Sequence, residues 1–331
     1  MPDAELPPPS QDDLDAEAIH ESPPPASPLR QRGLVVRTQS GFYTVETAVG
    51  RWTAQLRGRL KQGPVAEDLV AIGDWVEITA LGGREALIES VEPRRTEMIR
   101  SAPDARGEYR QVIVANLDQL ILVFACSRPS PRLGMLDRYL VIAEAQGLPA
   151  WIVANKTDLV GDEEARSLFS PYAEIGYPVL YTSARSGLGL DGIKEILAGK
   201  ISVFSGPSGA GKTTLLNAIQ PGLGLEVSEV SRATTKGRHT TVVREMFPLE
   251  SGGYVADTPG LKALALWDIE PDELDGYFRE IRPLVADCQY RDCTHIEEPG
   301  CAVRGAAEAG RIDPRRYESY IRMRLAQADE Y

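Results

Sequence analysis

The stretch Ile201–Thr213, which reads ISVFSGPSGAGKT, decides the fold class. An apolar strand at 201–204 runs directly into a glycine-rich loop, and the loop opens a predicted helix at 212–219. In this context backbone amides turn inward around phosphates, the lysine reaches the terminal phosphates and the next hydroxyl ligates Mg²⁺. We therefore predict a phosphate-binding loop. Its nucleotide-binding residues are Gly206, Pro207, Ser208, Gly209, Ala210, Gly211, Lys212, Thr213 and Thr214, and Thr213 is also a predicted magnesium ligand.

The regions around this loop alternate between apolar strands and amphipathic helices. Strands are expected at 119–125, 150–154, 178–182, 241–247 and 253–256, and further helices at 135–146, 163–175 and 190–197. This alternation is typical of a mainly parallel α/β sheet, whose ligands bind at the carboxyl ends of the strands.

A base-reading motif, NKTD, follows the strand expected at 150–154. An aspartate in the plane of guanine accepts hydrogen bonds from N1 and the 2-amino group, and adenine offers no such pair of donors. Asp158 therefore favours GTP over ATP, while Asn155 is expected to brace the loop and the Lys156 stem to cover the base. The residues assigned to the motif are Asn155, Lys156, Thr157 and Asp158.

Two more strings complete the predicted nucleotide site. After the strand at 178–182, Ser183 and Ala184 are expected to present a backbone amide to guanine O6. Asp257 begins DTPG at the end of another apolar strand, where an aspartate can hold the magnesium shell and Gly260 lets an amide approach the γ-phosphate. The phosphate loop, NKTD and DTPG all follow strands of one α/β region, and together these three strings indicate a GTP-binding site.

The residue that orients the attacking water for GTP hydrolysis is not the glutamine that many GTPases use. Many GTPases place a glutamine directly after the DTPG glycine, but Leu261 stands there and cannot form a hydrogen bond. His239, within GRHTT, lies where a mobile switch is expected and is the catalytic candidate, with a structural or partner-contacting role as the alternative. Thr240 or Thr241 is expected to ligate Mg²⁺, and the sequence does not separate the two.

The region before the α/β part has another pattern. Short alternating stretches separated by glycine predict strands at 34–37, 42–47, 52–56, 74–79 and 86–91. Such spacing favours a small OB-like barrel, a common platform for single-stranded nucleic acid. Tyr43, Trp52 and Trp75 are either base-stacking surfaces or core residues. Residues 1–32 hold eight of the 24 prolines and hardly an apolar side chain, which predicts a disordered acidic tail.

A cluster of soft ligands lies near the carboxyl terminus. Cys288, Cys293, His295 and Cys301 offer three thiolates and one imidazole, the number and type that suit tetrahedral zinc, although their spacing is not the usual pair of close doublets. Four protein ligands would close the shell, so we predict a structural metal. Cys126 follows an apolar strand and is expected in the core. The arginines around the cluster either contact RNA phosphates or lie on solvated helices: Arg291, Arg304, Arg311, Arg315, Arg316, Arg322 and Arg324.

Composition limits the classes of function. A net charge of −12 argues against indiscriminate binding to nucleic acid but leaves room for a local basic face. The longest apolar run, Leu120–Cys126, is too short for a membrane span, and the amino terminus lacks the pattern of a secretory signal. A cytoplasmic location is therefore expected.

The order of the motifs is unusual, because NKTD and TSA precede the phosphate loop, GRHTT and DTPG. With GDWV at 73–76, the chain from about 33 to 331 resembles the bacterial family of small-subunit-dependent, circularly permuted GTPases. The resemblance implies a multidomain α/β protein. It would have a tail at 1–32, an OB-like barrel at 33–98, a permuted P-loop GTPase domain at 99–270 and a small helical zinc domain at 271–331.

The resemblance also implies activity and partners. It implies GTP hydrolysis stimulated by the small ribosomal subunit during late maturation, with His239 catalytic and the cysteine cluster holding one Zn²⁺. The implied ligands and partners are GTP or GDP, Mg²⁺ and the rRNA of that subunit, with a monomeric protein and no membrane. The rivals are an RNA-binding protein with GTP as a static ligand, and a kinase that uses the same loop. The acidic tail and net charge depart from the family pattern.

Overall fold

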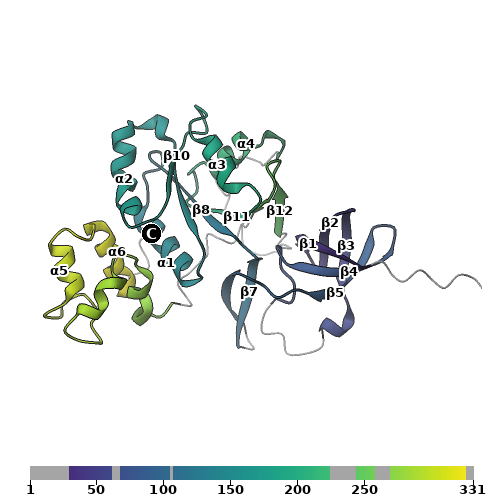
Figure 1. Ribbon diagram of the computed structural model, residues 1–331, viewed down its shortest axis with the longest axis horizontal. Coiled ribbons are helices and arrows are strands. Elements are labelled where there is room, and N and C mark those ends of the chain that lie inside the picture. Colours follow the sequence, from purple (N-terminus) through teal and green to yellow (C-terminus); the bar gives the residue numbers. More distant parts are fainter. Residues whose placement is uncertain (1–29, 62–67, 105–106, 224–243, 258–268, 326–331) are drawn as a thin grey trace, which may run out of the picture.

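The computed structural model describes residues 30–61, 68–104, 107–223, 244–257 and 269–325. Figure 1 shows a sheet flanked by helices in the middle of the molecule, with a strand-rich barrel on one side and a small helical region on the other. Within the described ranges, no helix combines the length and the apolar character needed to cross a membrane.

The first strands close into a small barrel, as the sequence predicts. They are β1 Arg30–Gln39, β2 Phe42–Thr47, β3 Gly50–Leu56, β4 Trp75–Gly82 and β5 Glu85–Val91, and the helical turn η2 Gly58–Lys61 follows β3. β1 pairs with both β2 and β4, β2 with β3, β3 with β5, and β5 with β4, which closes the ring. Alternate side chains such as Val45, Val76 and Ile88 fill the interior.

Charged residues extend the first strand beyond what hydropathy predicts. β1 begins at Arg30, because Arg30–Gly33 pair with β4 although they offer little apolar surface. Arg30 pairs with Glu77 at 3.1 Å, and Arg32 pairs with Glu92 at 2.6 Å. The Arg32 guanidinium also lies 3.8 Å from the ring centroid of Trp75. Trp52 belongs to the barrel core. Of the two roles considered for this tryptophan, base stacking and core packing, the structure therefore supports core packing.

A hairpin that the sequence analysis did not predict follows the barrel. It consists of β6 Glu97–Asp104 and β7 Gly107–Ala115, which form a two-stranded sheet. The side chains of Val112 and Ala115 are buried beside Ala71 of the barrel.

The central sheet carries the helices on both faces, as Figure 1 shows. Its strands are β8 Gln119–Ala125, β9 Ala150–Asn155, β10 Val179–Tyr181, β11 Ile201–Ser205, β12 Arg244–Pro248 and β13 Tyr254–Asp257. Its helices are α1 Leu133–Ala145, α2 Asp162–Glu174, α3 Leu190–Leu197 and α4 Lys212–Ile219, with the turns η3 Thr157–Leu159 and η4 Pro221–Leu223. Leu120 and Leu122 of β8 pack in one core with α1, and Ile121 and Val123 pack in another with α3 and α4.

The central sheet and the barrel are continuous through one strand. The parallel order β10-β9-β8-β11-β13 ends with the antiparallel β12, and β12 also pairs with β1. Apart from β6 and β7, the described strands thereby form one 11-stranded sheet with an order that runs from β10 to β4.

The carboxyl-terminal region consists of short helices. They are η6 Pro271–Tyr277, η7 Arg282–Asp287, α5 Ala302–Glu308 and α6 Pro314–Arg324. Their core contains Phe278, Val303 and Tyr320, and it also contains Val141 from α1 of the central domain. This region therefore shares part of its core with its neighbour.

Candidate functional site

The phosphate loop needs glycine for two separate reasons. At Gly206, directly after β11, φ is +137°, and an added Cβ would lie 2.0 Å from the carbonyl oxygen of Val123 on β8. At Gly211, before α4, φ is +93°, and an added Cβ would lie 2.5 Å from Nδ2 of Asn155. A side chain at either position would meet both backbone strain and a steric clash. The loop is thus shaped by strands that lie beside it.

Lys212 is held against this loop. Its Nζ donates to the carbonyl oxygens of Gly206 at 2.7 Å and Pro207 at 2.8 Å. Ser208 and Gly209 are exposed at the turn of the loop, while Ala210 is buried. An ammonium at the start of α4, next to the first backbone amides of the helix, provides the positive potential that phosphate oxygens require.

Asn155 joins the two predicted halves of the site. Its Nδ2 donates to the carbonyl oxygen of Ala210 in the phosphate loop at 2.9 Å, and its Oδ1 accepts from the Thr182 hydroxyl at 3.2 Å. Thr157 donates from its backbone and its hydroxyl to the carbonyl of Thr182, both at 3.1 Å. The loops after β9, β10 and β11 are therefore braced as one unit.

Asp158 is exposed and has one hydrogen-bonded neighbour on the adjacent loop. The Ser183 hydroxyl donates to Oδ1 of Asp158 at 2.6 Å and accepts from the backbone amide of Ser186 at 3.1 Å. Ala184 is half-buried next to Ser183. This contact fixes the carboxylate while leaving acceptor capacity for a base.

A further loop belongs to the site, and the sequence analysis did not predict it. Lys156, at φ +63°, directs its Nζ to the carbonyl of Arg128 at 2.5 Å. Pro129 lies beside Gly209 of the phosphate loop, 3.4 Å from the position of an added Cβ. The sequence could have indicated this loop, because it follows β8 and therefore begins at the same carboxyl edge of the sheet as the nucleotide loops. Cys126, which precedes it, is buried as predicted.

The magnesium and catalytic candidates are only partly within the described residues. Ala256 of β13 is in register with Val203 of β11. Asp257 therefore lies level with Phe204, two residues before the phosphate loop begins at Gly206. The structure describes the backbone of Asp257 as the end of β13. The other candidates lie outside the described residues: His239, Thr240, Thr241 and Gly260.

The cysteine and histidine side chains converge, as their residue types predict although their spacing is unusual. One ligand atom from each of Cys288, Cys293, His295 and Cys301 lies within 4.8 Å of all the others. His295 Nδ1 is 3.5 Å from the Sγ atoms of both Cys288 and Cys301. Tetrahedral zinc places a nitrogen ligand about 3.5 Å from a thiolate ligand, so these two distances and the four residue types fit a zinc ion.

The groups around the cluster orient the histidine. Nε2 of His295 lies 3.2 Å from Oδ2 of Asp275, the carboxylate contact that commonly fixes the tautomer of a metal-binding histidine. The Tyr317 hydroxyl donates to the His295 carbonyl at 2.6 Å, and the Arg304 amide donates to Cys301 Sγ at 3.3 Å. These contacts point Nδ1 toward the thiols.

Arg316 fixes the carboxyl-terminal region to the central domain. The residue is 2% exposed, and it donates to Asp137 Oδ1 of α1 and to Glu280 Oε1, each at 2.7 Å. Burial works against the charge, but the two carboxylates outweigh it and raise the pKa of Arg316. The expectation that Arg316 meets RNA or lies on a solvated helix is therefore wrong, because a charged residue becomes buried when the fold supplies partners.

The other arginines near the cluster lie closer to the surface. Arg304 pairs with Glu308, Arg315 with Asp313, Arg322 with Glu318 and Arg324 with Asp272. Arg291 and Arg311 are exposed.

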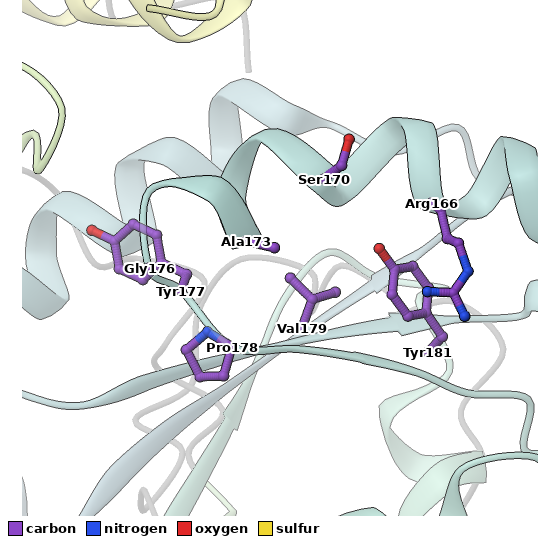
Figure 2. A pocket seen from close by; sticks show the side chains of 8 residues that line it. All are labelled: Arg166, Ser170, Ala173, Gly176, Tyr177, Pro178, Val179 and Tyr181. Carbon is purple, nitrogen blue, oxygen red and sulfur yellow. The ribbon is translucent and has the colours of Figure 1, made fainter.

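A hollow of about 580 Å³ lies between α2 and β10, away from the phosphate loop (Figure 2). At one end the Arg166 guanidinium lies 5.1 Å from the ring centroid of Tyr181. At the other end Arg279 donates to the Gly176 carbonyl at 2.7 Å and covers the ring of Tyr177. None of the predicted nucleotide or metal residues lines it.

The converging loops lie at the carboxyl edge of a doubly wound sheet, and in chain order the base-reading loops precede the phosphate loop. This arrangement is that of a circularly permuted P-loop GTPase. The model for the RsgA GTPase family matches residues 91–267, and the model for the RsgA N-terminal domain matches residues 32–88. The chain belongs to the RsgA family and is a GTP hydrolase.

Relatives and solved structures agree with this membership. The chain is 47% identical over 295 residues to the small ribosomal subunit biogenesis GTPase RsgA of Gemmatimonas aurantiaca, covering 88% of this chain and 96% of the relative. It is 45% identical to the protein of the same name from Moorella thermoacetica, covering 87% and 94%. YjeQ from Thermotoga maritima superposes with a TM-score of 0.74 at 36% identity, covering 92% and 100%. YloQ, a circularly permuted GTPase, superposes with a TM-score of 0.68 at 31% identity, covering 92% and 96%.

Proposed function

We propose that this GTPase acts on the small ribosomal subunit, assists a late step of its maturation and hydrolyses GTP faster when bound to it. The observation that carries the proposal is the name shared by the relatives from Gemmatimonas aurantiaca and Moorella thermoacetica, which the chain matches over nearly their whole length. A protein with this role works in the cytoplasm, where subunits mature. The kinase and the static GTP-binding protein have no observation in their favour.

We assign GTP binding to the three braced loops. Asp158 reads the base, the Lys156 stem covers it, Ser183 and Ala184 border it, and Asn155 and Thr157 hold the loops together. The support is the chain of contacts from Ser183 to Asp158 and from Asn155 to the phosphate loop. The phosphates are assigned to 206–214, with Lys212 facing the terminal phosphates.

Mg²⁺ and Zn²⁺ are the proposed ions. Thr213, Asp257 and either Thr240 or Thr241 would hold Mg²⁺ beside the phosphates, where it neutralises developing charge. Cys288, Cys293, His295 and Cys301 would hold one Zn²⁺ in a closed shell with a structural role.

We also propose a division of labour among the parts of the chain. The barrel at 33–98 and the zinc region at 271–331 would contact rRNA, and the domain at 99–270 would time release. The exposed Arg291 and Arg311 near the metal cluster support a contact with phosphates. The acidic segment before Arg30 would stay outside that contact, because its charge repels RNA. A monomer suffices for this role.

The deciding experiment measures phosphate release from GTP by the full-length protein, alone and with purified small or large ribosomal subunits. We expect small subunits to raise turnover on the order of tenfold or more and large subunits to leave it unchanged, because a partner can complete the catalytic geometry of a GTPase. GTP that stays bound without stimulated turnover would contradict the proposal, as would transfer of phosphate to a small molecule.

His239 is the proposed catalytic residue. His239→Ala should slow subunit-stimulated hydrolysis on the order of a hundredfold while GTP affinity stays nearly unchanged, because one positioned group typically contributes that much. His20→Ala removes a histidine from the amino-terminal segment and is the matched control. Normal stimulated turnover in a folded His239→Ala protein would assign this histidine to a structural or partner-contacting role.

A further inference from the structure

The hairpin β12–β13 lies between the barrel and the nucleotide site. β12 pairs with β13 on one side and with β1 of the barrel on the other. Figure 1 shows β12 between the central helices and the barrel strands. The chain enters this hairpin three residues after Thr241 and leaves it at Asp257. The hairpin therefore joins the two segments that carry the predicted magnesium ligands outside the phosphate loop.

A row of charged residues crosses the three strands. Arg37 of β1 is opposite Glu245 of β12, and Glu245 is opposite Asp257 of β13. Nη1 of Arg37 lies 4.0 Å from Oε1 of Glu245. Two acidic residues opposite each other on neighbouring strands destabilise their pairing, and a cation on the third strand offsets this effect. Arg37 of the barrel is thus joined to the strand that pairs with the backbone of Asp257.

Two further contacts fasten the hairpin to its surroundings. The Tyr254 hydroxyl, at the start of β13, donates to Oε1 of Glu46 on β2 at 3.2 Å. Arg244, at the start of β12, donates to the Val112 carbonyl of β7 at 3.0 Å and lies 3.6 Å from Oδ2 of Asp68. Both strands of the hairpin are therefore tied to elements outside the central domain.

We propose that the β12–β13 hairpin couples the barrel to the nucleotide site, with Arg37 and Glu245 as positioning residues for Asp257. A partner that displaces the barrel would shift β12 through its ladder with β1, and so move Asp257 relative to the phosphate loop. By linkage the effect is reciprocal, so exchange of GDP for GTP changes the β1–β12 junction. The effect of a partner on GTP hydrolysis rests on the proposed function, whereas the effect of the bound nucleotide on β1 does not.

The first test needs no ribosome. Amide hydrogen exchange is measured on the full-length protein with Mg²⁺ and either GDP or a non-hydrolysable GTP analogue. We expect peptides from 30–39 to change their exchange rate between the two nucleotides, while peptides from 85–91 in β5, which does not pair with β12, stay constant. Equal exchange of the 30–39 peptides with both nucleotides would overturn the proposal.

The second test exchanges the charges across the junction. Glu245→Arg places two cations opposite each other and should reduce both the nucleotide effect on β1 and the subunit-stimulated turnover, the latter on the order of fivefold. Adding Arg37→Glu restores an attractive pair and should recover most of both effects. Asp191→Arg, at the exposed Lys194–Asp191 pair of α3, is the matched charge reversal and should change neither.

The outcomes separate the two proposals. A double variant as impaired as Glu245→Arg alone would mean that the substitution only damages the fold, and would overturn the coupling. If small subunits fail to stimulate the unaltered protein, the proposed function is wrong, and the exchange experiment alone decides whether the hairpin couples barrel and nucleotide.

Discussion

The nucleotide loops and the cysteine cluster both bring polar groups together, but by different means. The nucleotide loops follow strands of a well-packed sheet, and bonds such as Asn155 to Ala210 hold their backbones. The cysteine cluster is carried by short helical turns, with Cys288 directly after η7 and Cys301 directly before α5. The first site is thus shaped by its scaffold, whereas the second would depend on the zinc ion that we propose for its four ligands.

The two regions are less separate than their sequences indicate. Val141 of α1 belongs to the carboxyl-terminal core, and Asp137 of the same helix accepts from the buried Arg316. Loss of the metal would therefore expose surface on α1, but the nucleotide loops lie on two other cores. We therefore expect loss of the metal to unfold the carboxyl-terminal region while GTP binding at the nucleotide loops changes little.

The largest effect is expected from loss of the zinc ligands. Cys301→Ser should release the metal and unfold the carboxyl-terminal region locally, because binding of a structural zinc ion contributes about 10 to 16 kcal/mol to folding. GTP affinity should stay within about threefold, since the nucleotide loops have their own core. Elemental analysis, nucleotide titration and proteolysis of the region after residue 271 measure the three quantities.

Cys126→Ala is the matched control, because Cys126 is buried outside the cluster. This variant should keep its metal. A Cys301→Ser protein that retains one zinc ion, or protein that contains no zinc when purified without chelators, would contradict the structural-zinc assignment.

Arg316→Met tests the link between the two regions. It should lower the free energy of unfolding by about 3 to 5 kcal/mol, because Asp137 and Glu280 would stay buried without their cation. Burial already raises the pKa of Asp137. Without the guanidinium this carboxyl would take up a proton at higher pH, so the loss should be smaller at pH 5 than at pH 8.

Urea denaturation at both pH values measures this effect. Arg315→Met removes the neighbouring, largely exposed arginine and should cost less than about 1 kcal/mol. Equal losses for the two variants would show that the buried charge cluster does not secure the carboxyl-terminal region.

Asp158→Asn tests the scaffold-built site without disturbing its scaffold. The change should weaken GTP binding about a hundredfold, because a charged acceptor for two guanine donors is replaced by a neutral amide. It should favour xanthosine triphosphate, which presents an acceptor where guanine presents its amino group. Competition titrations with both nucleotides measure the switch, and Asp162→Asn in α2 is the control. An unchanged order of preference would reject Asp158 as the base reader.

The smallest effect is expected at the start of α6. Asp313 accepts from the Arg315 amide at 2.8 Å as the helix cap, so Asp313→Ala should cost about 1 kcal/mol and Asp313→Asn much less. Although burial opposes it, hydrogen bonding with Arg315 lowers the pKa of Asp313. The charge-dependent part of the cap is therefore present above the ordinary value of 3.8 and is lost as pH falls below it.

Thermal unfolding of the three proteins between pH 3 and pH 7 tests the cap. Asp313→Ala should differ from the unaltered protein most at pH 7. If the two proteins differ in thermal stability by the same amount at pH 3 as at pH 7, the charge of Asp313 does not contribute to the cap.

Local sequence patterns were sufficient for much of the fold. The strands and helices of the central domain are found close to their predicted positions, because glycine loops and apolar periodicity act over a few residues. The hairpin β6–β7 was missed because Pro103, Asp104 and Gly107 interrupt its alternation. The start of β1 was missed because its arginines gain partners only on β4 and at Glu92, far away in the chain.

The sequence by itself determined which residues offer nucleotide and metal chemistry, because those motifs are short and their side-chain types are specific. Only the tertiary structure decided that Arg128 and Pro129 border the nucleotide loops, that Arg316 is buried against α1, and that β12 joins the barrel to the central sheet. Each of these contacts joins residues far apart in the chain. Their formation depends on the packing of whole elements, which no local pattern of residues encodes.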